Sequence, residues 1–371
     1  MGSRSLVVAE DPTLAPNCKY AILAVHNVRA DVPPNLILQG GIRVASGSFP
    51  FPLDDHWKEW LGTIQFNALQ ACNLFLVRTS TEGWPEGDLV VSGDEVSQSL
   101  QQEVGGLFAM LRLLGTIEYE NAFMLAGYVQ DGKSTCKQFA QTERFNITRG
   151  CLPWLIKERD LRTAVELSRT YSGLQQGFRN AERWRFGRGC NCLKRGLEQY
   201  YASDRLHGFV RALEALILPE PGKTEKQFVS RCALFAGPKA EEANMRTMLQ
   251  EAYRMRCDIE HVHDWDRSLQ AYPADDRENV ALWRTRQMEV LACAANTRIL
   301  LDTNVQQHFC SDAAIAAFWQ KPQEEIRAAF GDICDITRLK IVRKYDGTGR
   351  AAASEWPAGW LDNLRREAHS A

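Results

Sequence analysis

The chain has 371 residues, of which 45% are hydrophobic and 24% are charged. This balance is typical of globular proteins and excludes a wholly disordered or fibrous chain, and the length is too great for one ordinary core. The formal net charge is -2, so any nucleic-acid binding has to use a local basic patch.

The first part of the chain reads as a mixture of strands and helices. Residues 20–28 and 35–46 are rich in β-branched and aliphatic side chains and predict strands, separated by turn residues. Residues 63–79 are apolar and fit either a strand or a helix. Residues 97–114 carry apolar side chains at helical spacing and predict one amphipathic helix.

Residues 122–140 predict two strands that meet at Asp131-Gly132, a strong hairpin signal. Within them, residues 127–134 formally match the phosphate-binding loop G-x4-G-K-[ST], in which Lys133 would contact phosphate. Such a loop opens a helix and is accompanied by a later apolar strand ending in Asp, which we do not find at a useful distance. The hairpin is therefore favoured, and a P-loop nucleotide hydrolase is the weaker alternative.

The chain beyond residue 152 reads as almost wholly helical. Helical patterns cover residues 158–185, 203–218, 240–263 and 278–306. Thr224 and Gln227 predict a capping box at the start of a further helix. We therefore expect an α+β protein with an N-terminal mixed domain, a helical connector, an all-α bundle and a C-terminal extension, over residues 1–152, 153–200, 201–310 and 311–371.

The helix expected over residues 240–263 contains an anomaly. Its apolar stripe, which includes Leu249 and Ile259, runs through position 256, where an arginine stands. A buried guanidinium is costly unless an anion meets it. One candidate partner is Glu214, on the flank of the apolar stripe of residues 203–218, and another is a phosphate, whose oxygens match the planar guanidinium.

The end of this helix carries a known pattern. The run YRMRCDIEHVHD, residues 253–264, resembles the R-x(4–6)-H signature of HEPN domains. Upstream, RLHGFVRALEAL and FVSRCALFAG resemble the first two helices of the ApeA-like branch of that superfamily. The resemblance covers residues 203–306 and implies a bundle of two helix pairs that dimerises so that two such motifs face each other.

The resemblance also implies an activity. Many HEPN members are metal-independent ribonucleases of toxin–antitoxin, CRISPR or anti-phage systems, whereas others have lost activity and only bind or scaffold. Carried over by position, the signature makes Arg256 and His261 the expected catalytic pair. In the implied reaction histidine moves protons and arginine stabilises the extra charge on phosphorus, which leaves a 2′,3′-cyclic phosphate.

His263 also satisfies the spacing of the signature. On a straight helix His263 shares a face with Arg256, whereas His261 lies about 140° away from it. The resemblance favours His261, and the helix geometry keeps His263 as a rival. The alternative to a catalytic role is that both histidines are exposed near a helix C-terminus, which attracts such side chains.

Several residues around the signature have expected supporting roles. Family members often carry a small polar residue directly after the arginine, where this chain has Cys257, so Asp258 is the nearest substitute. Glu214 and Arg231 are expected to pair, either to orient the site or only to brace two helices. Tyr253, within the same run, completes the supporting set.

The segment 179–195 is rich in basic residues and contains Trp184 and Phe186. Basic groups contact phosphates and aromatic rings stack on bases, so this segment is a candidate for RNA contact, against the alternative of a solvated helix end. The residues expected to bind RNA are Arg183, Arg185, Arg188, Lys194 and Arg195.

Neither a cofactor nor a metal is expected. The run HVHDWD departs from the metallo-hydrolase pattern H-x-H-x-D-H, and the 11 scattered cysteines include no C-x-x-C pair. Free thiols, together with the lack of a signal peptide or of any apolar run near the roughly 20 residues that span a bilayer, favour a cytoplasmic protein without a membrane partner.

These expectations combine into one leading hypothesis and one main alternative. The first is a dimeric RNA-cleaving effector of a prokaryotic defence system, whose N-terminal domain senses a trigger or holds a protein partner. The second is a catalytically silent HEPN subunit that binds or scaffolds within a larger defence or regulatory complex.

Overall fold

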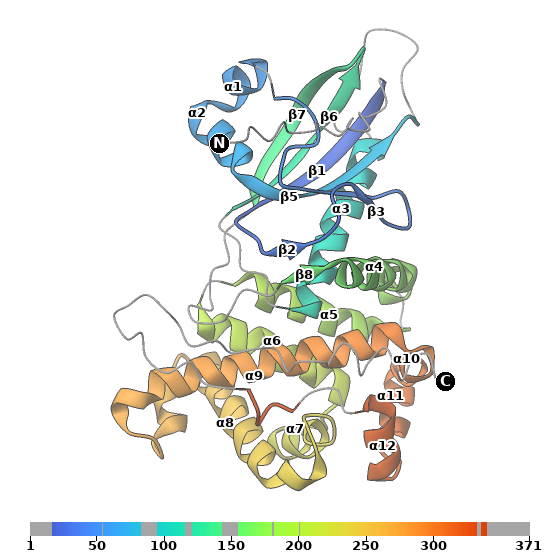
Figure 1. The fold of residues 1–371 in the computed structure, drawn as a ribbon. Coiled ribbons are helices and arrows are strands. Elements are labelled where there is room, and N and C mark those ends of the chain that lie inside the picture. The colour runs from blue at the N-terminus through green and yellow to red at the C-terminus, as the bar shows by residue number, and fades with distance from the viewer. Residues whose placement is uncertain are drawn as a thin grey trace, which may run out of the picture. The chain divides into compact units, whose positions relative to one another are not determined.

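The computed structural model describes residues 17–53, 55–82, 95–115, 121–142, 155–179, 182–199, 201–331 and 335–339. It has the α+β architecture that the sequence predicts, with one main antiparallel sheet and many helices (Figure 1). The chain divides into two compact units. The first comprises Met1–Phe108, Glu118–Arg144 and Leu155–Arg162, and the second comprises Ala109–Ile117, Phe145–Trp154 and Thr163–Ala371.

The first unit is built on a sheet of six strands in the order β3-β4-β5-β1-β6-β7, all antiparallel. Strand β1 lies in the interior of the sheet and is buried on both faces, so apolar residues run through it without alternation. The strands are β1 Cys18–His26, β3 Leu36–Ile37, β4 Arg43–Ser46, β5 Cys72–Ser80, β6 Ala122–Gln130 and β7 Lys133–Thr142. A short parallel pair joins β2 Ala30–Asp31 to β8 Ile156–Lys157.

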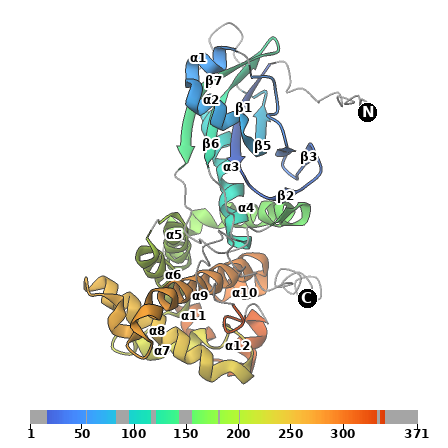
Figure 2. The same cartoon turned by 60° about the vertical axis from the view of Figure 1, so that its left-hand side comes forward.

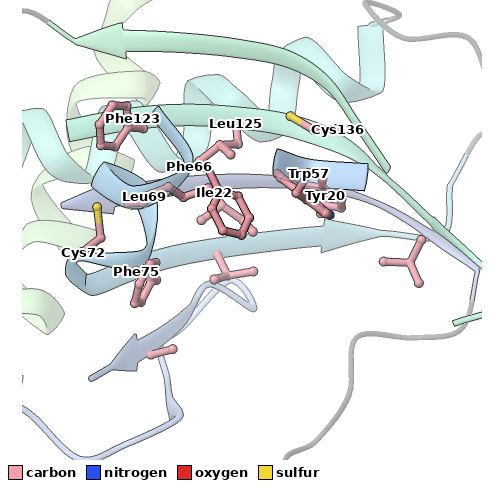
Figure 3. Packing of buried hydrophobic residues seen from close by; sticks show 14 of the residues in the cluster. Tyr20, Ile22, Trp57, Phe66, Leu69, Cys72, Phe75, Phe123, Leu125 and Cys136 are labelled. Atoms are coloured by element: carbon pink, nitrogen blue, oxygen red, sulfur yellow. The ribbon is translucent and has the colours of Figure 1, made fainter. Parts of the chain in front are cut away.

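Helices cover both faces of this sheet. On one face α1 Asp55–Leu61 and α2 Thr63–Gln70 pack onto the strands, and Figure 3 shows Trp57 beside Tyr20 of β1 and Phe66 beside Ile22. On the other face lies α3 Glu95–Leu114, where a Cβ on Gly105 would stand 3.5 Å from the Met124 side chain of β6. Because helices cover both faces, residues 20–25 of β1 are buried and lack the apolar–polar alternation of a strand with one face in solvent.

Two segments of the first unit settle choices that the sequence left open. Residues 63–79 are neither one strand nor one helix, because α2 ends at Gln70 and β5 begins at Cys72. The segment around Asp131-Gly132 is the predicted hairpin, with φ of 51° and 76° at its two turn residues. Lys133 therefore begins strand β7 instead of opening a helix, and the P-loop alternative is wrong.

The second unit is helical, and its helices are drawn from green to red in Figures 1 and 2. Helices α5 and α6 pack closely, since a Cβ on Gly208 would lie 2.7 Å from the Cα of Gly196. The helices after α3 are α4 Glu158–Arg179, α5 Trp184–Glu198, α6 Ala202–Ile217, α7 Thr224–Cys232, α8 Glu242–Glu260, α9 Ala274–Leu301, α10 Thr303–Gln307, α11 Asp312–Phe318 and α12 Gln323–Phe330, with 3-10 turns at Lys239–Glu241 and Trp265–Leu269.

The long helix α9 is the centre of this unit and contacts α5, α6 and α8. Every residue from 284 to 300 is buried, including several charged ones. These charges are paired, as burial requires. Glu289 lies 2.7 Å from both Arg205 and Arg286, and Arg284 contacts Glu251 of α8 at 2.6 Å.

Some helix ends differ from the sequence expectation. The capping box is wrong, because Lys223 is the N-cap of α7 and Gln227 instead binds the backbone and side chain of Glu220. Helix α8 ends at Glu260 and not at residue 263. Across the described parts of the chain, none of the helices has the length and apolar character needed to cross a membrane.

Candidate functional site

Helix α6 brings three polar side chains onto one face. His207, Arg211 and Glu214 are spaced by four and three residues, which places them on the same side of a helix. The Arg211 Nη1 lies 3.1 Å from Glu214 Oε2, and the Arg211 side chain is 48% exposed whereas Glu214 is buried. The polar face of α6 is therefore exposed to solvent at Arg211 and buried at Glu214.

Helix α8 meets this face with Arg256, which is only 5% exposed. Its Nη2 lies 3.2 Å from Glu214 Oε2 of α6, and its Nη1 lies 2.5 Å from Glu260 Oε2 one turn further along α8. The guanidinium carbon is 5.8 Å from the centre of the Tyr253 ring. The structure thus confirms both the burial of Arg256 and its contact with Glu214, and it adds Glu260 as a second carboxylate.

His207 is the member of this cluster that the sequence analysis missed. Its Nδ1 lies 3.9 Å from Glu260 Oε1, and its side chain is 38% exposed. Partial burial, followed by the positive charge of Arg256, lowers the pKa of His207 below its usual value. One pattern in the sequence could have pointed to His207. It shares a helical spacing with Arg211 and Glu214 at the edge of a clean apolar stripe.

The histidines of the R-x(4–6)-H pattern lie beyond the end of α8. The backbone N–H of Val262 donates to Ile259 and that of His263 to Asp258, which is the hydrogen-bond pattern of a Schellman turn. Both His261 and His263 are exposed, with ring centres 6.3 Å apart. The expectation that His263 shares a helical face with Arg256 is wrong, because the helix has already ended.

Val262, between the two histidines, is in the left-handed conformation with φ of 57° and is 93% exposed. A glycine is usual at this position of the turn, and a β-branched residue pays a steric cost there. Because the Val262 side chain is exposed, its burial does little to offset this steric cost. Backbone strain is therefore stored directly beside the two histidines.

Two of the supporting residues, Arg231 and Asp258, have partners other than those expected. Arg231 does not pair with Glu214; its Nη1 donates to the carbonyl oxygens of Ile217 and Leu218, so it caps the C-terminal end of α6. Burial raises the pKa of Tyr253 to about 12, so its hydroxyl stays protonated. Asp258 is engaged elsewhere, because its Oδ2 accepts a hydrogen bond from Ser268.

The basic segment of α5 is only partly available to a ligand. Arg183 donates to the carbonyl oxygen of Gln306, and Arg185 binds Asp312 through two hydrogen bonds of 2.9 and 3.0 Å. Lys194 lies 3.9 Å from Glu198. Arg188 and Arg195 are exposed and form no ion pair with any described residue.

The two aromatic residues of this segment have different positions. Trp184 is 46% exposed and shares one face of α5 with Arg188 and Arg195, whereas Phe186 is fully buried and unavailable for stacking on a base. Among the residues that the structure describes, no group of three or more His, Cys, Asp or Glu side chains is placed to hold a metal ion.

The fold and the site define an α+β protein with a buried, carboxylate-paired arginine between two helices and a half-exposed histidine beside it. Comparison of the chain with protein-family models, curated proteins and solved structures gave no match.

Proposed function

We propose that the protein is a metal-independent endoribonuclease of the HEPN type, an effector of a prokaryotic defence system that acts in the cytoplasm. The observation that carries the proposal is the buried guanidinium of Arg256, which α8 holds against α6, five and seven residues before two exposed histidines. A cation and imidazole groups within one region are the groups that phosphodiester transesterification requires.

Arg256 is the electrostatic group of the proposed reaction. Its guanidinium stabilises the extra negative charge that develops on phosphorus when the RNA 2′-hydroxyl attacks. Because the side chain is buried, its charge acts through a medium that screens it less than water does. Glu214 holds the planar group in one orientation from the neighbouring helix.

His261 is the proposed proton donor or acceptor of the signature. It directly follows Glu260, which contacts Arg256, and its ring is open to solvent and hence to a substrate. His263 stays the rival, since it is equally exposed and lies beside His261. A homodimer through the helical bundle would bring a second set of these residues to one composite site.

RNA is the proposed substrate, and helix α5 offers a surface for its backbone. Arg188 and Arg195 lie on one exposed face with Trp184, and Lys194 lies at its edge with a distant carboxylate partner. Lysine and arginine neutralise phosphates and an exposed tryptophan stacks on a base. Arg183 and Arg185, which are bound to Gln306 and Asp312, are proposed to hold α5 in place instead.

Incubation of the purified full chain with total RNA in the presence of EDTA tests the proposal. We expect cleavage that survives EDTA, with 2′,3′-cyclic phosphate and 5′-hydroxyl ends, and its loss in Arg256→Gln and His261→Ala. His56→Gln is the matched control and should cleave normally, because His56 is an exposed histidine of α1, distant in sequence from the site. Intact RNA with wild-type protein, assayed with and without candidate activators such as phage-infected extract, would contradict the proposal.

The paired state of Arg256 favours one second candidate function, a catalytically silent binding or scaffold subunit. Two carboxylates already neutralise the guanidinium, so a phosphate has to displace one of them. This candidate predicts RNA or protein binding that is unaffected by Arg256→Gln or His261→Ala. In either case we propose that the first unit senses a trigger or holds a protein partner.

A further inference from the structure

The polar cluster between α6 and α8 contains a histidine outside the R-x(4–6)-H pattern. We propose that His207 is the catalytic base of this site, the group that takes the 2′-hydroxyl proton of RNA, an inference that rests on the proposed ribonuclease function. It is carried by the position of His207 beside Glu260, whose other oxygen binds Arg256.

The exposure of the cluster places His207 where a substrate can reach it. The Arg256 side chain is only 7% exposed, whereas those of His207 and Arg211 are 38% and 48% exposed. An RNA phosphate that enters from solvent therefore meets the imidazole and Arg211 first, with the guanidinium of Arg256 behind them. The sequence signature supplies the buried cation, and α6 supplies the accessible base.

The charges around His207 keep its ring neutral and ready to accept a proton. Arg211 and Glu214 act on it from its own helix, and Arg256 and Glu260 act from α8. The two arginines disfavour the protonated form, the two carboxylates favour it, and partial burial is the largest effect. The net result is a pKa below the ordinary 6.5, so the ring is neutral at pH 7.

His261 lacks such surroundings. It forms no ion pair or side-chain hydrogen bond with any described residue, and the ring of His263 lies 6.3 Å from its own. Its exposed ring can reach a leaving group that departs towards solvent. The two histidines thus divide the proton transfers between them, with His207 as base and His261 as acid.

The reaction balances with these two groups. His207 takes the proton of the 2′-hydroxyl, the 2′-oxygen forms a bond to phosphorus, and the bond from phosphorus to the 5′-oxygen breaks. The leaving 5′-oxygen receives a proton from His261, and a 2′,3′-cyclic phosphate remains. Arg256 and Arg211 face the charge on the phosphorus oxygens throughout.

The test uses the full chain and a labelled single-stranded oligoribonucleotide taken from a sequence that the wild-type protein cleaves. We expect His207→Gln to lower kcat about 10²–10⁴-fold, and free imidazole to restore part of the activity of His207→Ala. The acid limb of the wild-type pH profile should lie below pH 6.5, and Arg211→Gln should move it upward, because a cation that lowers the pKa of His207 is removed.

The outcomes separate this inference from the proposed function. If the wild-type chain cleaves the oligoribonucleotide and His207→Gln cleaves it with the same kcat and pH profile, the base is not His207, while the ribonuclease function stands. If the wild-type chain leaves all RNA intact, both proposals fail together. His56→Gln controls for the loss of a histidine, and thermal unfolding of each variant shows whether it is folded.

Discussion

Glu260 lies 2.5 Å from Arg256, with its Oε2 on Nη1, and its other oxygen lies 3.9 Å from Nδ1 of His207. One carboxylate therefore connects the buried cation to the half-exposed imidazole. It also occupies an edge of the guanidinium that a phosphate would otherwise take. The carboxylate thus holds the residues of the site together and neutralises charge within it. The pKa of His207 should therefore respond when any of these charges is removed.

Glu260→Gln should lower the pKa of His207 further. The carboxylate of Glu260 favours the protonated ring, so its removal leaves only Glu214 to oppose the effect of the two arginines. The pKa is read from the chemical shifts of the His207 ring by NMR. Glu225→Gln, which removes a carboxylate paired with the exposed Arg254, is the control and should leave it unchanged.

Arg256→Ala should reduce the free energy of unfolding by about 3 kcal/mol, because it leaves the buried Glu214 with one fewer partner. Arg211 stays on Glu214 and keeps the loss at the low end of the usual range. The neighbouring Arg254, which pairs with Glu225 on the surface, provides the control, and Arg254→Ala should cost less than about 1 kcal/mol. Denaturant unfolding measures both; equal losses would contradict the burial argument.

Glu289→Ala should be among the most destabilising single changes in the helical unit. The carboxylate lies between Arg205 and Arg286, and its removal leaves two buried guanidinium groups close together, at a cost of about 3–5 kcal/mol. Glu325→Ala, which removes a solvent-exposed carboxylate 3.9 Å from Lys321, should change stability by less than about 1 kcal/mol. Calorimetric unfolding of the two variants gives the comparison.

Val262→Gly should stabilise the protein by about 1 kcal/mol, since glycine adopts a positive φ without steric cost. The valine side chain is almost fully exposed, so its loss removes little packing. Val262→Ala keeps a Cβ and should gain much less. A glycine variant that is less stable than wild type would show that the turn has a different conformation in solution.

Acid should destabilise the fold through His207 and His308. The pKa of each is lowered, chiefly by burial, so the unfolded chain binds more protons than the folded chain once the pH falls below about 6.5. Stability contributed by these neutral rings is present above that pH and is lost as the pH falls towards the folded pKa values. His207→Gln should therefore flatten the fall in denaturation midpoint between pH 7 and pH 5, whereas His56→Gln should not.

Much of the fold follows from local patterns in the sequence. The hairpin at Asp131-Gly132 and the helices α3, α6 and α8 were predicted because turn chemistry and apolar periodicity are local signals. Helix α9 was predicted over residues 278–306, but it begins at Ala274 and ends at Leu301, because its first turn is polar and caps are weak signals.

The site was only partly predictable for the opposite reason. Arg256 was visible because it interrupts an apolar stripe, and Glu214 because it flanks the stripe of the facing helix. The contact between His207 and Glu260 depends on how α6 and α8 pack. Nothing in either helix alone specifies that these two side chains approach to 3.9 Å. Arg231 was misassigned because a backbone carbonyl is a partner that no residue pattern reveals.

Helix α9 is enclosed along residues 284–300, without the solvent-facing side that most helices keep. Its amide hydrogens can therefore exchange with solvent only when the surrounding helices separate. Hydrogen–deuterium exchange at these positions should report the opening free energy of the helical unit by itself, independently of the sheet. Slower exchange at these residues in the presence of RNA or a partner chain would then show that binding stabilises the helical unit.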